Sequence, residues 1–573
     1  MEAPFTTRPE LRGTFGMVAS THWLASAAGM SMLERGGNAF DAAVAAGFVL
    51  QVVEPHLNGP GGEVPILLYS ATRDEVLVVD GQGPAPAAAT IRRFRELGHE
   101  LVPGTGLLAA CVPGAFDAWL LLLRDFGTLS PADVLAPALE YAETGYPLVP
   151  GICRSIAQME HVFREEWPES ARIYLRGGVP KPGSLFRNPD LAATYRRILA
   201  AAGRGDRERQ IESARNAFYR GFVADTIAGY CESNDALLAG DDLSCWEASV
   251  ERPAVGEYHG WRVHKTGPWG QGPVFVQQLA LLEGYELASL DRGGADFVHT
   301  VVECAKLAFA DREAWYGDPN FYDVPLAGLL SRGYAVERRR LVGQDASAEL
   351  HPGDPAGLEP RLPAVPAVEV AAPGLGEPTR GDTCHLDVVD RHGNVVSATP
   401  SGGWLHGSPV VPELGFCLST RAQMFWLEEG LPSSLQPRKR PRTTLSPTIV
   451  RGEDGTILAF GTPGGDQQDQ WSLVFFLSLV HFGLNAQEAI DAPMFHTEHF
   501  PESFYPRAAR PRTLQLESRF GDAVAAELGK RGHLVEVHEP WSLGRLSAAG
   551  RDGDGVLYAA ANPRGMQGYA VGR

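Results

Sequence analysis

The sequence predicts an α+β protein, because helix-like and strand-like stretches occupy separate parts of the chain. Residues 64–80 alternate as strands do, residues 112–350 are mainly helical, and residues 383–573 return to strand patterns. With 573 residues, the chain is longer than one ordinary domain and long enough to bury a large core.

Two helices and two strands are expected near the amino terminus. Ala25 to Arg35 favours a helix that Gly36 and Gly37 end, and Ala39 to Val53 is a helix of small apolar residues suited to packing against a sheet. Strands are expected next, and then the long helical stretch, which proline and glycine interrupt. The strands are 64–69 and 76–80, and the breaks are near 145–151, 176–189 and 266–273.

A hairpin opens the second strand-rich stretch. Its strands are residues 384–389 and 395–399, and a turn at residues 390–394 joins them. Further strands are expected at 447–451 and 457–461, before a helix from about 466 to 482 that Gly483 ends.

Composition excludes several classes of function. The formal net charge is −19 and the pI is near 5.3, so the surface repels nucleic acid and anionic lipid, and we expect neither as a partner. Residues 1–5 show no signal-peptide pattern, and no run of 18 apolar residues occurs, so we expect a cytoplasmic protein. The seven cysteines are scattered and never form a Cys-x-x-Cys motif, which favours buried thiols over disulfides or a zinc site.

Thr383 stands at the start of the hairpin, directly after a stretch that we expect to be mobile. Residues 343–380 are rich in Pro, Gly, Ala and Glu, a composition that cannot bury enough apolar surface to order itself firmly. If the bond before Thr383 were cut, its new α-amine, with a pKa of about 7.7–8.0, would lie beside its hydroxyl. One residue would then supply both a nucleophile and a general base. The alternative is an ordinary threonine at the entry to a strand.

Short motifs recur in a fixed order along nearly the whole chain. They are Gly36-Gly37-Asn38-Ala39, Val53-Glu54-Pro55-His56, Gly59-Pro60-Gly61-Gly62, Gly381-Asp382-Thr383-Cys384-His385, Lys439-Arg440-Pro441, Ser446-Pro447-Thr448, Gly461-Thr462-Pro463-Gly464-Gly465 and Asp491-Ala492-Pro493. Through these motifs the chain resembles the gamma-glutamyltransferase family of N-terminal-nucleophile hydrolases. The resemblance implies a four-layer αββα sandwich, in which two stacked sheets are flanked by helices.

The resemblance also implies that the chain cuts itself between Asp382 and Thr383. The products would be a large fragment, 1–382, which ends in a mobile strap of about 343–382, and a small fragment, 383–573. We expect the two fragments to form one structural domain, because sheets that they share cannot be separated without exposing a core. A dimer of the processed unit is one of the assemblies that the sequence leaves open.

The predicted chemistry starts with attack by Thr383 Oγ on the carbonyl of Asp382, giving an ester that water hydrolyses. The same hydroxyl would then take an acyl group from a substrate, and the new amine would take the proton. Neither a metal nor an organic cofactor is expected.

Other site residues follow from the same resemblance. Gly464 and Gly465 lie between a strand and a helix, where backbone N–H groups can stabilise an oxyanion. Thr399 and Ser401 share one strand face and match hydroxyls that orient the nucleophile, although ordinary strand hydroxyls are the alternative. Thr443 and Thr444 match a pair of serines that bind the substrate carboxylate.

Departures from the family pattern bear on the substrate. The arginine that grips the α-carboxylate of a glutamyl group falls near Gln82, the aspartate that holds its amine falls at Phe425, and a donor-binding asparagine falls at Gly403. A pocket without these counter-charges should bind γ-glutamyl groups poorly. Trp404, Phe425 and Trp426 suggest a smaller or flatter acyl group, and Asp466 with Gln467 and Gln468 could face a small oxo-acid. The strings that contain them resemble the oxamate amidohydrolase branch of the family.

Other motifs give weaker evidence for a functional site. The run His496-Thr497-Glu498-His499 lacks regular metal-ligand spacing and favours structural histidines. The glycine-rich run 267–272 contains proline and is not followed by a clear βαβ unit, and no Gly-x-Ser-x-Gly elbow occurs.

The sequence therefore predicts a self-processing threonine amidohydrolase that acts on a small acyl or oxo-acyl amide. Three alternatives remain open: a γ-glutamyl hydrolase or transferase, a relative that cleaves a C–C bond to release an oxalyl unit, and an uncleaved scaffold protein.

Overall fold

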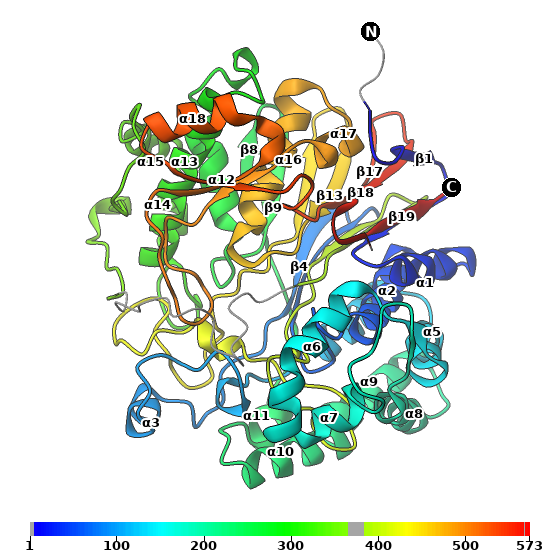
Figure 1. The fold of residues 1–573 in the computed structure, drawn as a ribbon. Helices are drawn as coiled ribbons and strands as arrows, with labels where there is room; N and C mark the ends of the chain where they lie inside the picture. The colour runs from blue at the N-terminus through cyan, green and yellow to red at the C-terminus, as the bar shows by residue number, and fades with distance from the viewer. Residues whose placement is uncertain (1–4, 365–382, 567) are drawn as a thin grey trace.

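The computed structural model describes residues 5–364, 383–566 and 568–573 (Figure 1). These residues form helices and two seven-stranded sheets, which confirms the α+β class. In Figure 1, α12, α13 and α16 lie on one side of the sheets, and α1, α2 and α5 lie on the other. Among the described residues, none of the helices has the length and apolar character that crossing a bilayer would need.

The first sheet interleaves strands from both sides of the predicted cleavage point. Its order is β19-β2-β10-β11-β3-β4-β7, so the hairpin β10–β11 pairs with β2 on one side and β3 on the other. The strands are β2 Gly16–Ser20, β3 Val64–Ser70, β4 Glu75–Gly81, β7 Ser249–Glu251, β10 Leu386–Asp390, β11 Val395–Ala398 and β19 Tyr569–Gly572.

The second sheet is also built from distant parts of the chain. Its order is β1-β18-β17-β13-β12-β9-β8. The strands are β1 Leu11–Gly13, β8 Ala254–Tyr258, β9 Trp261–Lys265, β12 Thr448–Gly452, β13 Ile457–Gly461, β17 Ser547–Arg551 and β18 Leu557–Ala561. The strands β7 to β9 lie within the stretch expected to be mainly helical. Each has only three to five residues, so its alternation is too brief to stand out against the surrounding helices.

The sheets face one another across a buried apolar layer. Met17 of β2 and Leu67 of β3 meet Ile449 of β12 and Ala549 of β17 in this layer. A second cluster lies between the first sheet and helices α1, α2, α4 and α5, and a third lies between the second sheet and helices α12, α13 and α16.

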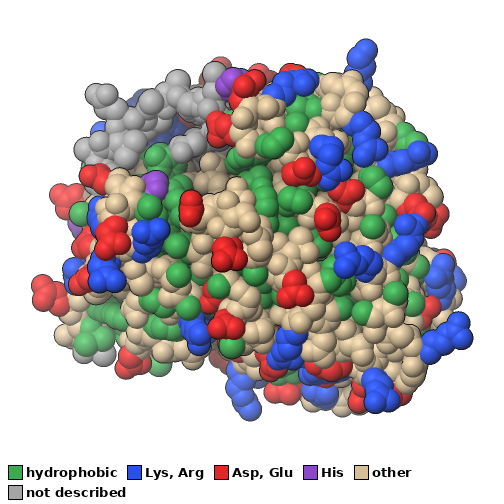
Figure 2. Space-filling view, turned by 90° about the horizontal axis from the view of Figure 1, so that it is seen from below, with side chains coloured by type: hydrophobic (Ala, Val, Ile, Leu, Met, Phe, Trp, Pro, Cys, Tyr) green, Lys and Arg blue, Asp and Glu red, His purple; other side chains and the backbone are tan. Residues whose placement is uncertain are grey.

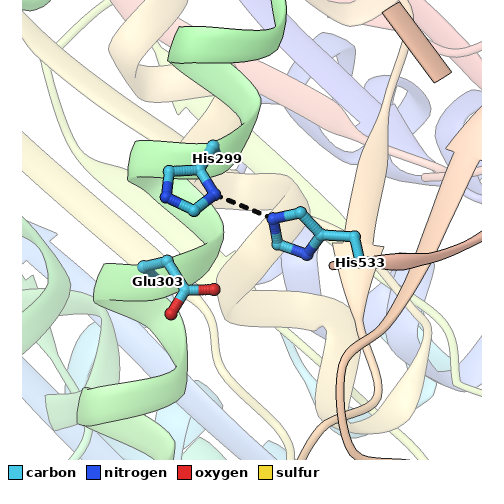
Figure 3. A group of neighbouring side chains, drawn as sticks. All are labelled: His299, Glu303 and His533. Atoms are coloured by element: carbon cyan, nitrogen blue, oxygen red, sulfur yellow. Dashed lines mark hydrogen bonds between the residues drawn. The ribbon is translucent and has the colours of Figure 1, made fainter. Parts of the chain in front are cut away.

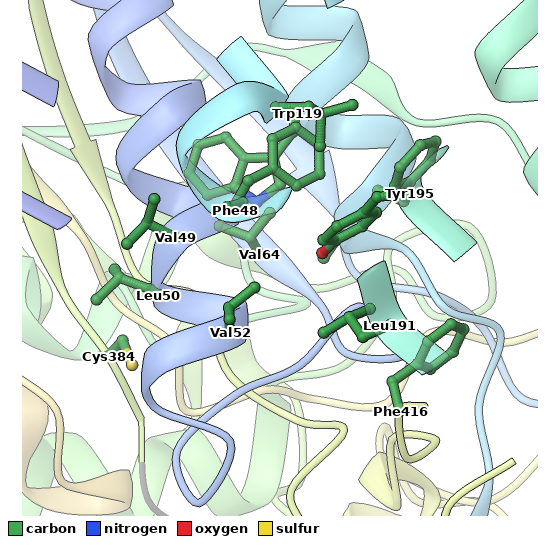
Figure 4. Packing of buried hydrophobic residues seen from close by; sticks show 14 of the residues in the cluster. Phe48, Val49, Leu50, Val52, Val64, Trp119, Leu191, Tyr195, Cys384 and Phe416 are labelled. Carbon is green, nitrogen blue, oxygen red and sulfur yellow. The ribbon is translucent and has the colours of Figure 1, made fainter. Parts of the chain in front are cut away.

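The helices α1, Trp23–Glu34, and α2, Ala39–Val53, agree closely with the sequence prediction. A capping box between Asn38 and Asp41 begins α2, whose residues are all buried. Leu50 of α2 lies beside Cys384, and Phe416 packs near Leu191 of α8 (Figure 4). Residues on both sides of the predicted cut therefore share one core.

The other helices complete the layers and the large helical lobe. They are α3 Ile91–Glu96, α4 Ala115–Phe126, α5 Pro131–Thr144, α6 Pro150–Glu165, α7 Pro168–Tyr174, α8 Pro189–Ala202, α9 Arg207–Tyr219, α10 Phe222–Ser233, α11 Gly240–Ser244, α12 Pro273–Leu282, α13 Ala295–Trp315, α14 Leu326–Leu329, α15 Arg332–Arg339, α16 Gln468–Phe482, α17 Ala486–Asp491 and α18 Asp522–Lys530. The shorter strands are β5 Tyr146–Pro147, β6 Leu185–Phe186, β14 Phe495–Thr497, β15 Thr513–Glu517 and β16 Leu534–His538.

The structure shows how charges are distributed on one face and whether the cysteines are buried. On the face shown in Figure 2, acidic and basic side chains are interspersed. The seven cysteines are free thiols, and six of them are buried. Cys245 is exposed, so the expectation of buried thiols is wrong at that position.

Candidate active site

Thr383 lies opposite Ser401, in line with the hairpin register but beyond the ends of its regular strands. The backbones form an antiparallel bridge, and the two hydroxyl oxygens are 3.3 Å apart. Thr383 is buried, with 1% of its surface exposed. Residues 365–382, which include the proposed cleavage partner Asp382 and the last part of the predicted strap, lie outside the described residues.

A row of three residues crosses the sheet at this point. Ser401 bridges Thr383 on one side and Glu63 on the other, so the three side chains point to one face. Arg421 spans the row: its Nη2 donates to Ser401 Oγ at 2.8 Å, and its Nε donates to Glu63 Oε1 at 2.6 Å. Burial raises the pKa of the Glu63 carboxyl, and the Arg421 charge opposes that shift.

Arg421 occupies an aromatic niche beside the nucleophile. Its guanidinium carbon is 5.1 Å from the ring centre of Trp404 and 5.6 Å from that of Phe504. Among the described residues, its Nη1 meets only the sulfur of Met424, at 3.8 Å. Arg421, whose Nη1 makes only this weak contact among the described residues, is therefore linked to Thr383 through Ser401. Sequence reasoning missed Arg421, whose one signal is its place just before the Gln423-Met424-Phe425-Trp426 string.

The hydroxyl of Thr399 has a different partner from the expected one. It lies 2.9 Å from Nδ1 of His385, whose Nε2 lies 3.0 Å from Asp387 Oδ1. The carboxylate can only accept, so Nε2 carries the proton and, in the neutral ring, Nδ1 accepts from Thr399. The prediction that Thr399 itself orients Thr383 is therefore corrected: it contacts His385 instead. The reason is register, since residue 399 lies directly across the hairpin from residue 385.

Asp387 completes a closed set of bonds around this histidine. Its two oxygens also accept from Ser397 and from Ser547, each at 2.8 Å. A Cβ on Gly461 would lie 2.3 Å from the His385 ring, so this position admits only glycine. The network ties the hairpin to the second sheet.

Gly464 and Gly465 adopt the strand–turn–helix geometry that the sequence predicts. β13 ends at Gly461, a 3₁₀ turn spans Gly465–Gln467, and α16 begins at Gln468. Both glycines have positive φ, 130° and 58°, and a Cβ on Gly464 would lie 2.3 Å from the Trp471 ring. Within the part of the chain that the structure describes, their N–H groups meet no acceptor. They remain available for an oxyanion.

Asp466 is not free to face a substrate. Its Oδ1 accepts from Arg312 and, at 2.6 Å, from Ser503 Oγ, and its Oδ2 accepts from the Ser503 N–H at 2.8 Å. Burial alone would raise the pKa of this carboxyl, but Arg312 and Ser503 outweigh it and lower the pKa. The predicted contact with an oxo-acid is corrected to a structural role.

Phe425 and Gln82 are both buried. Phe425 fills a small apolar cluster with Phe94 and Leu427, so it is a core residue. Gln82 is fully buried, and its Nε2 donates to the Gly83 carbonyl at 3.1 Å, while its Oε1 has no hydrogen-bond partner among the described residues.

The remaining predicted residues are Gly403, Trp404, Thr443 and Thr444. Gly403 has a positive φ of 64°, and a Cβ there would lie 3.0 Å from the Cys417 carbonyl, so the chain can pass closely only with glycine. Trp404 faces Arg421 and Phe504. The hydroxyl of Thr443 accepts weakly from the Leu445 N–H at 3.3 Å, whereas the buried hydroxyl of Thr444 meets no partner in the part of the chain that the structure describes.

Potential metal ligands come together away from this row. Among the described residues, His299 and Glu303 of α13 meet His533 (Figure 3). His299 Nδ1 lies 2.9 Å from His533 Nε2, and Lys306 donates to Glu303 at 2.6 Å. The nitrogens face each other and the carboxylate has an ammonium partner, which favours a hydrogen-bonded network. His499 likewise accepts from the Arg512 N–H at 3.0 Å, as a structural histidine does.

Comparison with known proteins covers almost the whole chain. A model of the gamma-glutamyltranspeptidase family matches residues 25–572. The chain is 32% identical over 566 residues to the glutathione hydrolase-like YwrD proenzyme of Bacillus subtilis, covering 98% of this chain and 99% of that protein. It is 31% identical over 568 residues to the oxamate amidohydrolase proenzyme of Klebsiella pneumoniae, covering 98% of each.

Two solved structures are also similar to this chain over its whole length. LmbA2991HD is 56% identical, with a TM-score of 0.95 over the whole of both chains. The cephalosporin acylase from Bacillus halodurans is 30% identical, with a TM-score of 0.84 over 100% of this chain and 98% of that one.

Proposed function

This chain belongs to the gamma-glutamyltranspeptidase family, and we propose from this premise that it cuts itself before Thr383 and then hydrolyses a small acyl or oxo-acyl amide. The observation that carries the proposal is the buried row of Thr383, Ser401 and Glu63, which Arg421 spans. A hydroxyl nucleophile in this row has an oriented hydroxyl neighbour and a cation behind it. These neighbours orient the nucleophile, while the general base and the oxyanion donors that acyl transfer also needs come from the Thr383 amine and from Gly464 and Gly465.

Self-cleavage uses the Thr383 hydroxyl before an amine exists. Oγ attacks the Asp382 carbonyl carbon, the Asp382–Thr383 C–N bond breaks, and the amine takes the proton while an ester forms. Water then hydrolyses the ester, which frees the Asp382 carboxyl and the Thr383 hydroxyl. Ser401, held by Arg421, lies where it can exchange a hydrogen bond with Oγ during both steps.

The amidase reaction repeats this pattern on a substrate. The α-amine of Thr383 takes the Oγ proton as Oγ attacks the substrate carbonyl, and then gives that proton to the departing amine. The N–H groups of Gly464 and Gly465 would hold the oxyanion. Water resolves the acyl-enzyme and returns the free hydroxyl.

The contacts of Arg421 support a small oxo-acyl group. An acyl group with a second oxygen beside its reacting carbonyl would place that oxygen near the Nη1 atom, which contacts the Met424 sulfur at 3.8 Å. Trp404 and Phe504 would cover its flat faces. A γ-glutamyl head needs a carboxylate for its ammonium group, and Glu63 is already paired with Arg421.

We also propose an architecture for the enzyme and its location in the cell. Two facing sheets with helices on both outer sides support a four-layer sandwich in which fragments 1–382 and 383–573 remain one structural domain. The strands of the two fragments alternate within one sheet, and this supports it further. We also propose that the enzyme works in the cytoplasm, which fractionation of expressing cells would test.

Mass spectrometry tests the reaction directly. Purified protein should give two fragments, the smaller beginning Thr383-Cys384-His385, and brief exposure to oxamate or another small amide should add an acyl mass to that fragment. Thr383→Ala should give one uncut chain and no adduct, while Thr144→Ala, at an exposed helix position, should behave as wild type. Rapid turnover of a γ-glutamyl anilide, with none of small oxo-acyl amides, would overturn the substrate assignment.

A further inference from the structure

The thiol next to the nucleophile is held by two side chains. Cys384 is fully buried, and its Sγ donates to Glu54 Oε2 at 2.9 Å and accepts from Asn58 Nδ2 at 3.1 Å. Neighbouring side chains of a hairpin point to opposite faces, and Cys384 packs in the apolar cluster beneath α2, away from the Thr383 hydroxyl. Its hydrogen is also engaged by a carboxylate. Both facts favour a thiol that anchors the chain over one that attacks a substrate.

The two groups that hold the thiol are themselves fixed at the end of α2. Figure 4 shows Cys384 beside this helix, and Glu54, fully buried, is its C-terminal cap. Glu54 Oε2 also accepts from Thr21 Oγ1 at 2.6 Å. Asn58 Nδ2 also donates to the Leu50 carbonyl of the helix at 3.0 Å. The contacts of the thiol therefore place it relative to a helix of the large fragment.

These contacts reach both strands of the reacting pair. The backbone of Asn58 forms a bridge with the residue after Ser401, and its side chain holds the residue after Thr383. The N–H of that residue, Cys384, donates to the carbonyl of the residue before Ser401 at 2.9 Å. The two hydroxyl oxygens of the pair are 3.3 Å apart, so their alignment depends on how their neighbours are held.

Self-cleavage would make this anchor more important. The cut would turn Thr383 into a chain end, and chain ends are poorly ordered unless other contacts hold them. Both its hydroxyl and its new amine must then face the substrate. The peptide between residues 383 and 384 is planar, so holding Cys384 fixes the plane from which Thr383 extends. A displacement of about 1 Å in a reacting group can slow a reaction about 100-fold.

We propose that Glu54 and Asn58 are positioning residues for Thr383, and that they act through the Cys384 thiol. The inference rests on the proposed function, because it takes Thr383 as the nucleophile. It gives the motif at residues 53–56 a part in the reaction, although none of its side chains belongs to the reacting row. The competing interpretation is that these buried hydrogen bonds only stabilise the fold.

The rate of self-cleavage tests the proposal without a substrate. Precursor from cell-free synthesis is sampled over time for the fragment that begins at Thr383. Cys384→Ala removes both bonds of the thiol and should slow this fragment's appearance by about 10- to 100-fold. Cys384→Ser keeps a group that donates and accepts, so it should cleave at nearly the wild-type rate. Cys231→Ala makes the same change at a buried thiol of α10 and should cleave as wild type.

A double variant separates positioning from simple loss of stability. Asn58→Leu should also slow cleavage, because it removes the donor to the sulfur. If Asn58 acts through the thiol, Asn58→Leu/Cys384→Ala should cleave no more slowly than the slower single variant. Two independent structural losses would instead multiply. If Cys384→Ala does not fold, slow cleavage in Asn58→Leu and normal cleavage in Cys384→Ser support the proposal.

Unfolding temperatures complete the test. They are measured in the uncut Thr383→Ala background, so that all variants are compared in one state. We expect Cys384→Ala to lose no more stability than Cys231→Ala, although only Cys384→Ala cleaves slowly. Equal cleavage by wild type and Cys384→Ala would overturn the inference alone, as would a Cys384→Ser variant that is as slow as Cys384→Ala. A wild-type chain that never releases the Thr383 fragment would instead overturn the proposed function.

Discussion

Two cross-strand pairs of the same hairpin, two residues apart, have different surroundings. In the inner pair, His385 and Thr399, the histidine bonds Asp387, whose oxygens also accept from Ser397 and Ser547. In the outer pair, Thr383 and Ser401, the serine meets Arg421, which retains a weakly engaged nitrogen. The inner pair belongs to a closed hydrogen-bond network, so we interpret it as structural. The outer pair ends at a cation that can still bind a ligand.

The largest effect should come from removing the outer nucleophile. Thr383→Ala leaves the fold intact but removes the attacking oxygen, so both self-cleavage and amide turnover should disappear. A denaturing gel and an activity assay check this. Two bands from the variant would move the nucleophile elsewhere.

Arg421→Met should have the next largest effect. It leaves the Glu63 carboxyl buried without its partner, which costs about 3–5 kcal/mol of unfolding free energy. The double variant Arg421→Met/Glu63→Gln should recover most of that stability in denaturant titrations. It should still cleave slowly, because the cation behind Ser401 is gone. Full recovery of the cleavage rate in the double variant would reduce Arg421 to a structural residue.

Lowering the pH should destabilise the region beside the outer pair. Burial lowers the pKa of His406, stacked on Trp404, to about 4, below its ordinary 6.5. The unfolded state therefore takes up this proton first, and stability present above pH 6.5 is lost between pH 6.5 and 4, by at most about 3 kcal/mol. His406→Gln should flatten the unfolding curve in that window, whereas exposed His392→Gln should not. Equal slopes for both variants would contradict this assignment.

Ser401→Ala should slow cleavage by about 10- to 100-fold, because Thr383 loses its oriented hydroxyl neighbour. Stability should fall by only about 1 kcal/mol. Time courses of fragment appearance after refolding measure the rate.

Thr399→Val should have the smallest effect on the reaction. It removes the hydrogen bond to His385 at a cost of about 1–2 kcal/mol, but should slow cleavage less than Ser401→Ala does. If Thr399→Val halts cleavage while Ser401→Ala does not, the roles of the inner and outer pairs are reversed.

Several site residues were predictable because their signals are local. Thr383 stands where a proline-rich stretch meets a strand, and Gly464-Gly465 lie between a strand and a helix, so the pattern around each one shows its place. Helix α2 was bounded correctly because its cap and its apolar run are contiguous. The interpretations of Phe425 and Asp466 failed because they depend on side-chain direction, which packing against Phe94 and Ser503 decides.

The sequence by itself determined the α+β class, the position of Thr383 at the entry to a strand, and the position of Gly464 and Gly465 between a strand and a helix. These features depend on neighbours within a few residues. Only the tertiary structure decided which buried charged groups pair with one another. Arg421 meets Glu63 across 358 positions of the chain, and Arg312 meets Asp466 across 154. Pairing of buried charges depends on distances of a few ångströms between segments far apart in sequence, and no local pattern encodes those distances.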